Sequence, residues 1–290
     1  MESRSEWDSP GPFGTTEIVP SVWDISSAVV AKEAGAKTLF LSGGAVSTNL
    51  ALPDRGLMTT DYLIDLSRSI VSHTGLPLFI DGEAGFGEGP VLAWFAERLL
   101  DAGVTGIMIE DQEYSGQAYT DAPGLCTSAE MVRRIEVVAG ATNNALQVIA
   151  RTDIISKVAP FEDVLARLRS YRDAGANWFM AIDLRTREEL DSVSDLVDGR
   201  VWVVVRRGSG YLPSLEDAQA FGCRSYLILY HQVMALTHLL DCYRKTMTGN
   251  VDEIYSGLLE GAAIARMMDF NRYLRWERAR WQRDPEIGTR

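Results

Sequence analysis

The sequence predicts an α/β fold, a single (β/α)8 TIM barrel followed by extra C-terminal helices. Five times along the chain, a helical stretch ends in glycine and a short apolar run follows within a few residues. This is the pattern of a loop from a helix to a strand. Strict alternation of strand and helix implies parallel strands joined by right-handed crossovers. The glycines that end the helices are Gly35, Gly75, Gly103, Gly175 and Gly222.

Three further apolar runs, 17–21, 146–153 and 200–205, bring the number of predicted strands to eight. Between the runs lie amphipathic stretches of helical period at 61–72, 91–102 and 161–173. An open doubly wound sheet would alternate in the same way. Eight nearly continuous apolar strands nevertheless favour closure into a barrel.

The chain continues beyond the eighth strand with helical patterns at 231–246, 251–268 and 271–284. We expect one domain over residues 1–290, with the barrel at about 15–247 and a C-terminal helical arm at about 248–290. These extra C-terminal helices suit an arm that packs on a neighbouring subunit, although they could equally cap the chain's own barrel.

With 290 residues, 46% hydrophobic and 23% charged, the chain can bury a large core and has the size of one soluble α/β barrel. A net charge of -12 argues against nucleic acid or a membrane surface as partner, because both would repel an acidic protein. Cys126, Cys223 and Cys242 have no paired spacing, which favours a reducing cytoplasm. The polar start of the chain does not read as a signal peptide, and no run reaches the ~20 apolar residues of a spanning helix.

Carboxylates follow most of the predicted strands, and barrel enzymes place their working groups at these strand ends. So many acids would repel one another unless a cation neutralised them. Since the candidate ligands are all oxygens, we expect Mg2+, with Mn2+ as an alternative. Each acid could instead cap the helix that follows it. The strand-end acids are Asp81, Glu83, Glu110, Asp111, Asp153 and Asp183.

Three of these acids form the predicted metal site. Asp81 and Glu83 are two residues apart on one strand and therefore share a face, and Glu110 ends the adjacent strand on the same rim. Arg151, on the next strand, could clamp a substrate carboxylate, or it could form a structural salt bridge to one of the acids.

The segment Ser42, Gly43 and Gly44 follows the second strand and offers backbone N–H groups at the barrel mouth. Such groups could hold a carboxylate or an oxyanion. The glycines could also mean only a tight turn.

Four ordered blocks resemble the isocitrate lyase and phosphoenolpyruvate mutase superfamily. They are VPSVWDISSAVVAKEAGAKTLFLSGGAVSTNLALPDRG, FIDGEAGFGEG, GIMIEDQ and VIARTD, and the resemblance runs from about Val19 to Leu227. It implies a Mg2+-dependent enzyme acting on a 2-oxo or 2-hydroxy acid, which makes or breaks a carbon–carbon or carbon–phosphorus bond through an enolate-like intermediate. It also implies tetramers that exchange a C-terminal helix.

The resemblance assigns roles to residues by their place in the blocks. Asp81 and Glu83 match the paired metal-binding aspartates, with glutamate in place of the second, and Glu110 matches an acid that reaches the metal through water. Arg151 matches the substrate-binding arginine. The remaining matches concern the substrate: Ser42, Gly43 and Gly44 for its carboxylate, Asp54 near the reacting centre, and Trp23 as an aromatic that faces it.

The sequence departs from the superfamily at catalytic positions. Gly116 and Ala118 stand where the superfamily has a lysine and a cysteine or asparagine, and Cys126 lies later in the same loop. Ile182 replaces an acid or histidine, and Asp183 is expected on the opposite face if the register holds.

Because the usual proton donor is missing, the sequence favours a reaction that needs little acid–base work, such as decarboxylation of a 2-oxo acid, or a chemistry in which Asp54, Tyr119 or Tyr114 handles protons. Arg206 or Arg207 is expected to bring a second cation into the mouth. His231, just after the eighth strand, is better placed than the other histidines but fits a buried structural role.

Three hypotheses for function follow from these residues. The first is a Mg2+-dependent carbon–carbon lyase or decarboxylase acting on a small 2-oxo or 2-hydroxy acid. The second is a carbon–phosphorus mutase or hydrolase of the phosphonopyruvate type, motivated by Asp54 and the absent cysteine. The third is a barrel that binds a metabolite without catalysis, motivated by Gly116, Ala118 and Ile182.

Overall fold

The computed structural model describes residues 16–113, 124–153, 160–206, 211–249, 258–270 and 273–275. The chain divides into two compact units, Met1–Val233 and Met234–Arg290. The boundary between the two units falls within the helix His231–Met247.

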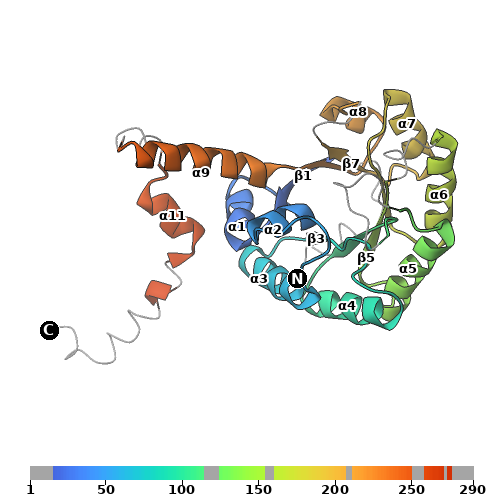
Figure 1. The fold of residues 1–290 in the computed structure, drawn as a ribbon, viewed down its shortest axis with the longest axis horizontal. Helices are drawn as coiled ribbons and strands as arrows, with labels where there is room; N and C mark the ends of the chain where they lie inside the picture. Colours follow the sequence, from blue (N-terminus) through green and yellow to red (C-terminus); the bar gives the residue numbers. More distant parts are fainter. Residues whose placement is uncertain are drawn as a thin grey trace. The chain divides into compact units, whose positions relative to one another are not determined.

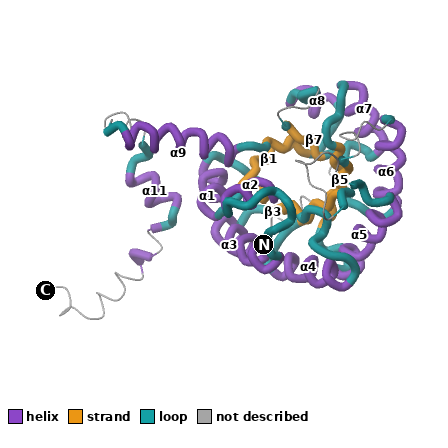
Figure 2. Tube along the Cα trace, viewed as in Figure 1, coloured by secondary structure: helices purple, strands orange, loops and turns teal. Residues whose placement is uncertain are grey.

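The first unit is a barrel of eight parallel strands with helices around it, as Figures 1 and 2 show, which confirms the predicted fold. Neighbouring strands follow the order β6-β5-β4-β3-β2-β1-β8-β7. Between β6 and β7 the described pairing is a single bridge, Phe179 to Val201, which nearly closes the ring. The strands are β1 Glu17–Val22, β2 Leu39–Leu41, β3 Leu78–Asp81, β4 Gly106–Glu110, β5 Gln147–Thr152, β6 Trp178–Ala181, β7 Trp202–Val205 and β8 Ser225–Ile228.

The amphipathic stretches at 61–72, 91–102 and 161–173 are helical as predicted, and helices surround the ring of strands (Figure 2). All five glycines of the predicted helix-to-strand loops have positive φ, and Gly75 (φ 67°) caps its helix directly. The helices of the barrel are α1 Ile25–Glu33, α2 Gly43–Asn49, α3 Thr60–Thr74, α4 Pro90–Asp101, α5 Ser128–Ala141, α6 Phe161–Asp173, α7 Arg187–Leu196 and α8 Leu215–Ala220.

Two apolar layers form the barrel, because successive side chains of a strand point to opposite faces. The inner layer fills the barrel with side chains such as Phe79, Met108, Ile149, Met180 and Trp202. The outer layer packs the strands against the helices. Residues an even number of positions beyond an inner-layer residue therefore point into the barrel mouth.

The second unit contains most of α9 His231–Met247, together with α11 Gly261–Met267. Large apolar side chains are exposed along α9, among them Leu240 at 50% and Tyr243 at 58%. Among the described residues, no helix is long and apolar enough to span a membrane.

Candidate active site

A cavity of about 510 Å3 lies at the C-terminal ends of the strands. Parallel barrels place their active sites at this end. Its charged and polar lining comes from β3, from β5, from the segment between β2 and α3, and from residues that follow β7 and β8, whereas β2, β4, β6, β7 and β8 contribute apolar side chains. The lining includes Phe40, Ser42, Gly44, Thr48, Asp54, Arg55, Asp81, Met108, Arg151, Met180, Ile182, Val204, Arg206, Leu227, Leu229, Tyr230 and Gln232.

The three predicted metal ligands are buried near one another. Asp81 lines the cavity, while Glu83 and Glu110 are 6% and 2% exposed. A Cβ on Gly43 would meet the carboxylates of both Asp81 and Glu83, so both groups lie against the Gly43 backbone.

Glu83 reaches the site by a route that strand alternation did not predict. Strand β3 ends at Asp81, and Glu83 follows in a left-handed conformation with φ 50°. Its N–H donates to Asp81 Oδ1 at 3.0 Å, and its carbonyl accepts from the Glu110 N–H at 2.9 Å. Non-glycine residues in this conformation store strain and cluster at functional sites.

The electrostatics of these acids are those of a shared buried site. Burial, reinforced by the charges of Asp81 and Glu110, raises the pKa of Glu83 well above its ordinary value. Burial raises the pKa of Glu110 to about 8, although Arg151 opposes the shift. Burial and then the charge of Asp81 raise the pKa of Asp54 to about 6. The carboxylates therefore resist ionising together.

Arg151 lies between two of the acids and also lines the cavity. Its guanidinium forms ion pairs with Glu110 Oε2 and Asp153 Oδ2, both at 3.1 Å. The structural salt bridge that the sequence left open is therefore present. Because Arg151 also faces the cavity, it remains available to an anionic ligand.

The Ser42–Gly44 segment packs against carboxylates of the protein itself. Ser42 caps α2 by accepting from the Ala45 N–H. The Gly43 N–H donates to Asp81 Oδ2 at 3.3 Å, and a Cβ on Gly44 would lie 2.8 Å from Asp54 Oδ2. The glycines thus allow close approach of Asp81 and Asp54, a role distinct from the predicted substrate cradle.

Asp54 lies in the cavity wall, and its Oδ1 is buried with no hydrogen-bond partner among the described residues. Sequence reasoning missed its neighbour Arg55, together with Thr48, Tyr230 and Gln232, which also line the cavity. They lie on loops or helices that follow strands, where strand alternation gives no guidance.

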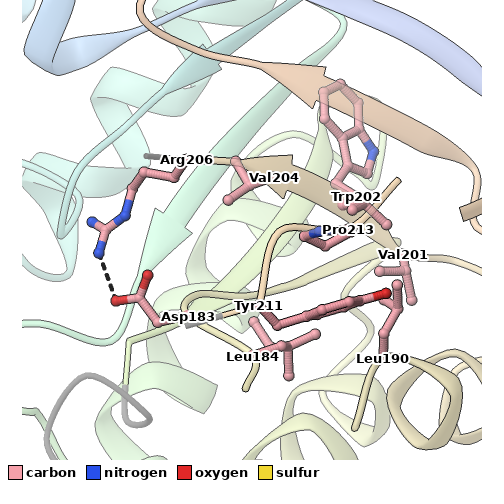
Figure 3. A pocket seen from close by; sticks show the side chains of 11 residues that line it. Asp183, Leu184, Leu190, Val201, Trp202, Val204, Arg206, Tyr211 and Pro213 are labelled. Atoms are coloured by element: carbon pink, nitrogen blue, oxygen red, sulfur yellow. Dashed lines mark hydrogen bonds and ion pairs between the residues drawn. The ribbon is translucent and has the colours of Figure 1, made fainter. Parts of the chain in front are cut away.

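Arg206 lines the cavity as predicted and forms an ion pair with Asp183 at 2.5 Å. Figure 3 shows the two side chains pointing toward each other beside a second cavity of only about 20 Å3. Asp183 adopts a left-handed conformation (φ 61°), and Ile182 takes the cavity-facing position of strand β6. Arg207 lies outside the described residues.

Other predicted groups lie elsewhere. Trp23 packs against the outer apolar layer, and its backbone N–H donates to Ser27 Oγ. The described lining of the cavity does not include Trp23. Cys126 is buried, and burial raises the pKa of its thiol to about 11, which disfavours a reactive thiolate. His231 pairs through Nδ1 with Ser21 Oγ at 3.1 Å, and burial lowers its pKa. Tyr119, with Tyr114, Gly116 and Ala118, lies outside the described residues.

The donor chemistry of this site fits a hard divalent cation. Oxygen atoms of Asp54, Asp81, Glu83 and Glu110 are clustered and desolvated, and Asp54 Oδ1 has no hydrogen bond to other described residues. In this arrangement no group of three or more His, Cys, Asp or Glu side chains among the described residues is positioned to hold a metal ion. The fit therefore rests on the donor set and its charge.

Comparison with known proteins agrees with the barrel fold and with the resemblance that the four sequence segments carry. The profile of the family described as phosphoenolpyruvate phosphomutase matches residues 13–244. A 2-methylisocitrate lyase from Halalkalibacterium halodurans is 31% identical over 180 residues, which are 62% of this chain and 59% of that protein. The chain thus spans about three-fifths of the length of this curated relative.

Two solved structures share the fold. A 2,3-dimethylmalate lyase, a PEP mutase/isocitrate lyase superfamily member, has a TM-score of 0.81 at 24% identity, covering 96% of this chain and 99% of its own. A phosphonopyruvate hydrolase in complex with oxalate and Mg2+ has a TM-score of 0.80 at 21% identity, covering 98% of each chain. The resemblance read from the sequence is therefore confirmed: the chain belongs to the phosphoenolpyruvate phosphomutase family, and it shares its fold with a PEP mutase/isocitrate lyase superfamily member.

Proposed function

We propose that this chain is a Mg2+-dependent lyase or decarboxylase that cleaves a carbon–carbon bond of a small 2-oxo or 2-hydroxy acid through an enolate-like intermediate. The observation that carries the proposal is the cavity at the barrel mouth, where Asp54, Asp81 and Arg151 face one space. Membership of the family and similarity to a 2-methylisocitrate lyase support it.

The residues divide the chemistry among them. Asp81, Glu83 and Glu110 would hold the cation, Mg2+ or alternatively Mn2+, which supplies stabilisation of the negative charge that develops on an enolate. Arg151 binds the substrate carboxylate through its planar fork, and Arg206, paired with Asp183, lines the same cavity and contacts the substrate there. The Gly43 N–H donates to Asp81, Gly44 leaves room for Asp54 beside its backbone, and Ser42 caps the helix that carries both glycines.

Proton transfer is assigned to Asp54, with Tyr119 as the second candidate. A pKa of about 6 lets the Asp54 carboxyl carry or accept a proton near neutral pH, and the residue lines the cavity. A decarboxylation or a retro-aldol cleavage of this kind needs little further acid–base work. We further propose that the enzyme works in the cytoplasm as a homo-oligomer, a dimer or a tetramer, with a small carboxylic acid as its partner.

The proposal is tested by calorimetric titration of Mg2+ and of Mn2+ into the protein with oxalate, an enolate mimic. We expect saturable binding that Asp81→Asn abolishes. The matched control is Asp101→Asn, which changes an exposed aspartate of α4 that pairs with Arg98. Absence of binding to the wild-type protein would remove the proposal.

Turnover is then sought with 2-oxo and 2-hydroxy acids, with products identified by NMR. Binding of Mg2+ and oxalate without turnover of any acid would instead favour a metabolite-binding barrel that has lost catalysis.

A carbon–phosphorus mutase or hydrolase is the second candidate, and the position of Asp54 in the cavity wall favours it. Phosphorus NMR with phosphonopyruvate tests it. A new phosphate or phosphate-ester signal that Asp54→Asn removes would support this activity, and an unchanged spectrum would exclude it.

A further inference from the structure

We infer that the acid recognised by this site carries an uncharged, apolar substituent, which packs on the side of the cavity formed by β6, β7 and β8. The inference rests on the proposed function, because it concerns the same cavity and names the class of substrate that fills it.

The two halves of the cavity differ in chemistry. Around the barrel, β3, β4 and β5 are adjacent, and they carry Asp81, Glu110 and Arg151. The adjacent strands β6, β7 and β8, with the residues that directly follow β6 and β8, line the cavity with the apolar side chains of Met180, Ile182, Val204, Leu227 and Leu229. The polar lining on this side comes from Arg206 after β7 and from Tyr230 and Gln232 after β8. A ligand that spans the mouth therefore contacts charge at one end and hydrocarbon at the other.

The apolar half is continuous with the core of the barrel. Met180, Ile182 and Leu227 are at most 3% exposed and belong to the inner layer. Val204 and Leu229 are partly buried and pack against the same layer. A charged or hydroxylated substituent placed here would lose its hydration to an apolar surface, which costs free energy unless a new hydrogen bond replaces the water.

Among the described residues that follow β6, β7 and β8, Arg206 is the cationic side chain that lines the cavity. Its charge is already paired. It contacts Asp183 at 2.5 Å, as the dashed line in Figure 3 marks. A second carboxylate of a substrate would therefore compete with Asp183 for the same guanidinium. The pair instead provides a nearly neutral edge to the apolar half.

The size of the cavity agrees with a substituent of several carbons. A volume of about 510 Å3 falls within the range of about 300–1,000 Å3 that is typical of small-molecule sites. The acid and keto groups of a substrate fill only the charged end, so the rest is available to the substituent.

The test uses oxamate and its N-alkyl derivatives, measured by calorimetry on the full-length protein with saturating Mg2+. Affinity should rise about three- to fourfold per added methylene from N-methyl to N-propyl oxamate. N-propyl oxamate should bind about tenfold more tightly than N-(2-hydroxyethyl) oxamate, which has nearly the same shape but ends in a hydroxyl.

A matched pair of variants locates the effect. Ile182→Asn should reduce the preference for the propyl compound to less than about threefold, whereas Ile182→Val should keep most of it. Equal binding of the two isosteric compounds to the wild-type protein, or tighter binding of the hydroxyl compound, overturns the inference while oxalate binding leaves the proposed function standing. Failure of oxalate itself to bind would remove the proposed function and this inference with it.

Discussion

Arg151 is the residue on which the charge balance of the mouth depends. It pairs with Glu110 and Asp153, and its charge opposes the burial that raises the pKa of Asp81, Glu83 and Glu110. A planar fork with several donors can hold two carboxylates and still present an edge to the cavity, which a lysine ammonium cannot.

Arg151→Lys should therefore weaken oxalate binding by about tenfold or more, because lysine keeps the charge but loses the planar fork that can bind two carboxylates and the ligand together. Calorimetry in saturating Mg2+ measures the change. The matched control is Arg185→Lys, which alters a partly exposed pair with Glu189 and should leave the affinity unchanged. Equal affinities for the Arg151→Lys and wild-type proteins would contradict the assigned role.

The raised pKa values predict how stability depends on pH when no divalent cation is bound. Ordinary carboxyl pKa values near 4 apply to the unfolded chain, whereas the folded pKa is about 6 for Asp54 and about 8 for Glu110. The folded state binds these protons more tightly, so the stability that Asp54 and Glu110 contribute is fully present below about pH 4 and is lost as the pH rises toward and through their folded values.

Urea denaturation between pH 5.5 and pH 8.5 measures this slope, which is at most about 1.4 kcal/mol per pH unit for each titrating carboxyl. Glu110→Gln should flatten the decline in the free energy of unfolding above pH 7. Added Mg2+ should oppose the same decline in the wild-type protein. A stability that rises with pH over this interval would show that these acids are not destabilised by burial.

Alternation along the strands explains which site residues the sequence could predict. Asp81, Glu110 and Arg151 lie two residues beyond inner-layer positions, so the period of two places them at the mouth. Ile182 and Val204 obey the same period, but the sequence cannot separate a cavity wall from an ordinary core. Trp23 follows β1 at the turn into α1, where the period no longer applies.

At the scale of elements, Asp111 connects β4, β5 and α6 from the outer face of the barrel. Its fully buried carboxylate accepts from Thr152 Oγ1 at 2.7 Å, Tyr171 Oη at 2.8 Å and Arg167 Nη1 at 3.0 Å. Arg167 also donates to the Cys126 carbonyl at 3.0 Å. The neighbour of a predicted metal ligand is thus a structural residue, a distinction that follows from the opposite faces of Glu110 and Asp111.

Asp111→Ala should lower the free energy of unfolding by about 3 kcal/mol or more, because it leaves the Arg167 guanidinium without its buried partner. Chemical denaturation measures the loss. Asp101→Ala, at an exposed pair on α4, should cost no more than about 1 kcal/mol. Similar losses for the two variants would contradict the importance of the Asp111 network.

Helix positions were predictable for a different reason. Helices α3, α4 and α6 match the amphipathic stretches within two residues, since their apolar faces must cover the barrel. The helix α2 is only seven residues long, too short to show an amphipathic pattern, and the sequence did not predict it. Its start depends on the Ser42 cap rather than on a hydrophobic stripe.

For the whole molecule, α9 carries an exposed apolar stripe at helical spacing. Leu236, Leu240, Tyr243 and Met247 are 43%, 50%, 58% and 80% exposed. A stripe of this kind marks an association surface on a soluble protein. It is consistent with the proposed homo-oligomer, in which a second copy of the chain covers α9.

Leu240→Glu should therefore shift the protein toward smaller species in sedimentation velocity at micromolar concentration. His238→Glu adds the same side chain to the exposed opposite face of the helix and should leave the oligomer intact. A wild-type protein that sediments as a monomer would remove the oligomeric proposal.

The junction of β6 and β7 has a consequence for the range of acids that the barrel can accept. Every other neighbouring pair is joined by a ladder, whereas the described contact here is one bridge with a hydrogen bond from the Phe179 N–H to the Arg200 carbonyl. Few shared backbone bonds permit local opening at low cost. Strands β6 and β7 also form much of the apolar side of the cavity. We therefore expect the barrel to accommodate a bulky substituent by separating these two strands locally, while the ends of β3, β4 and β5 keep their positions.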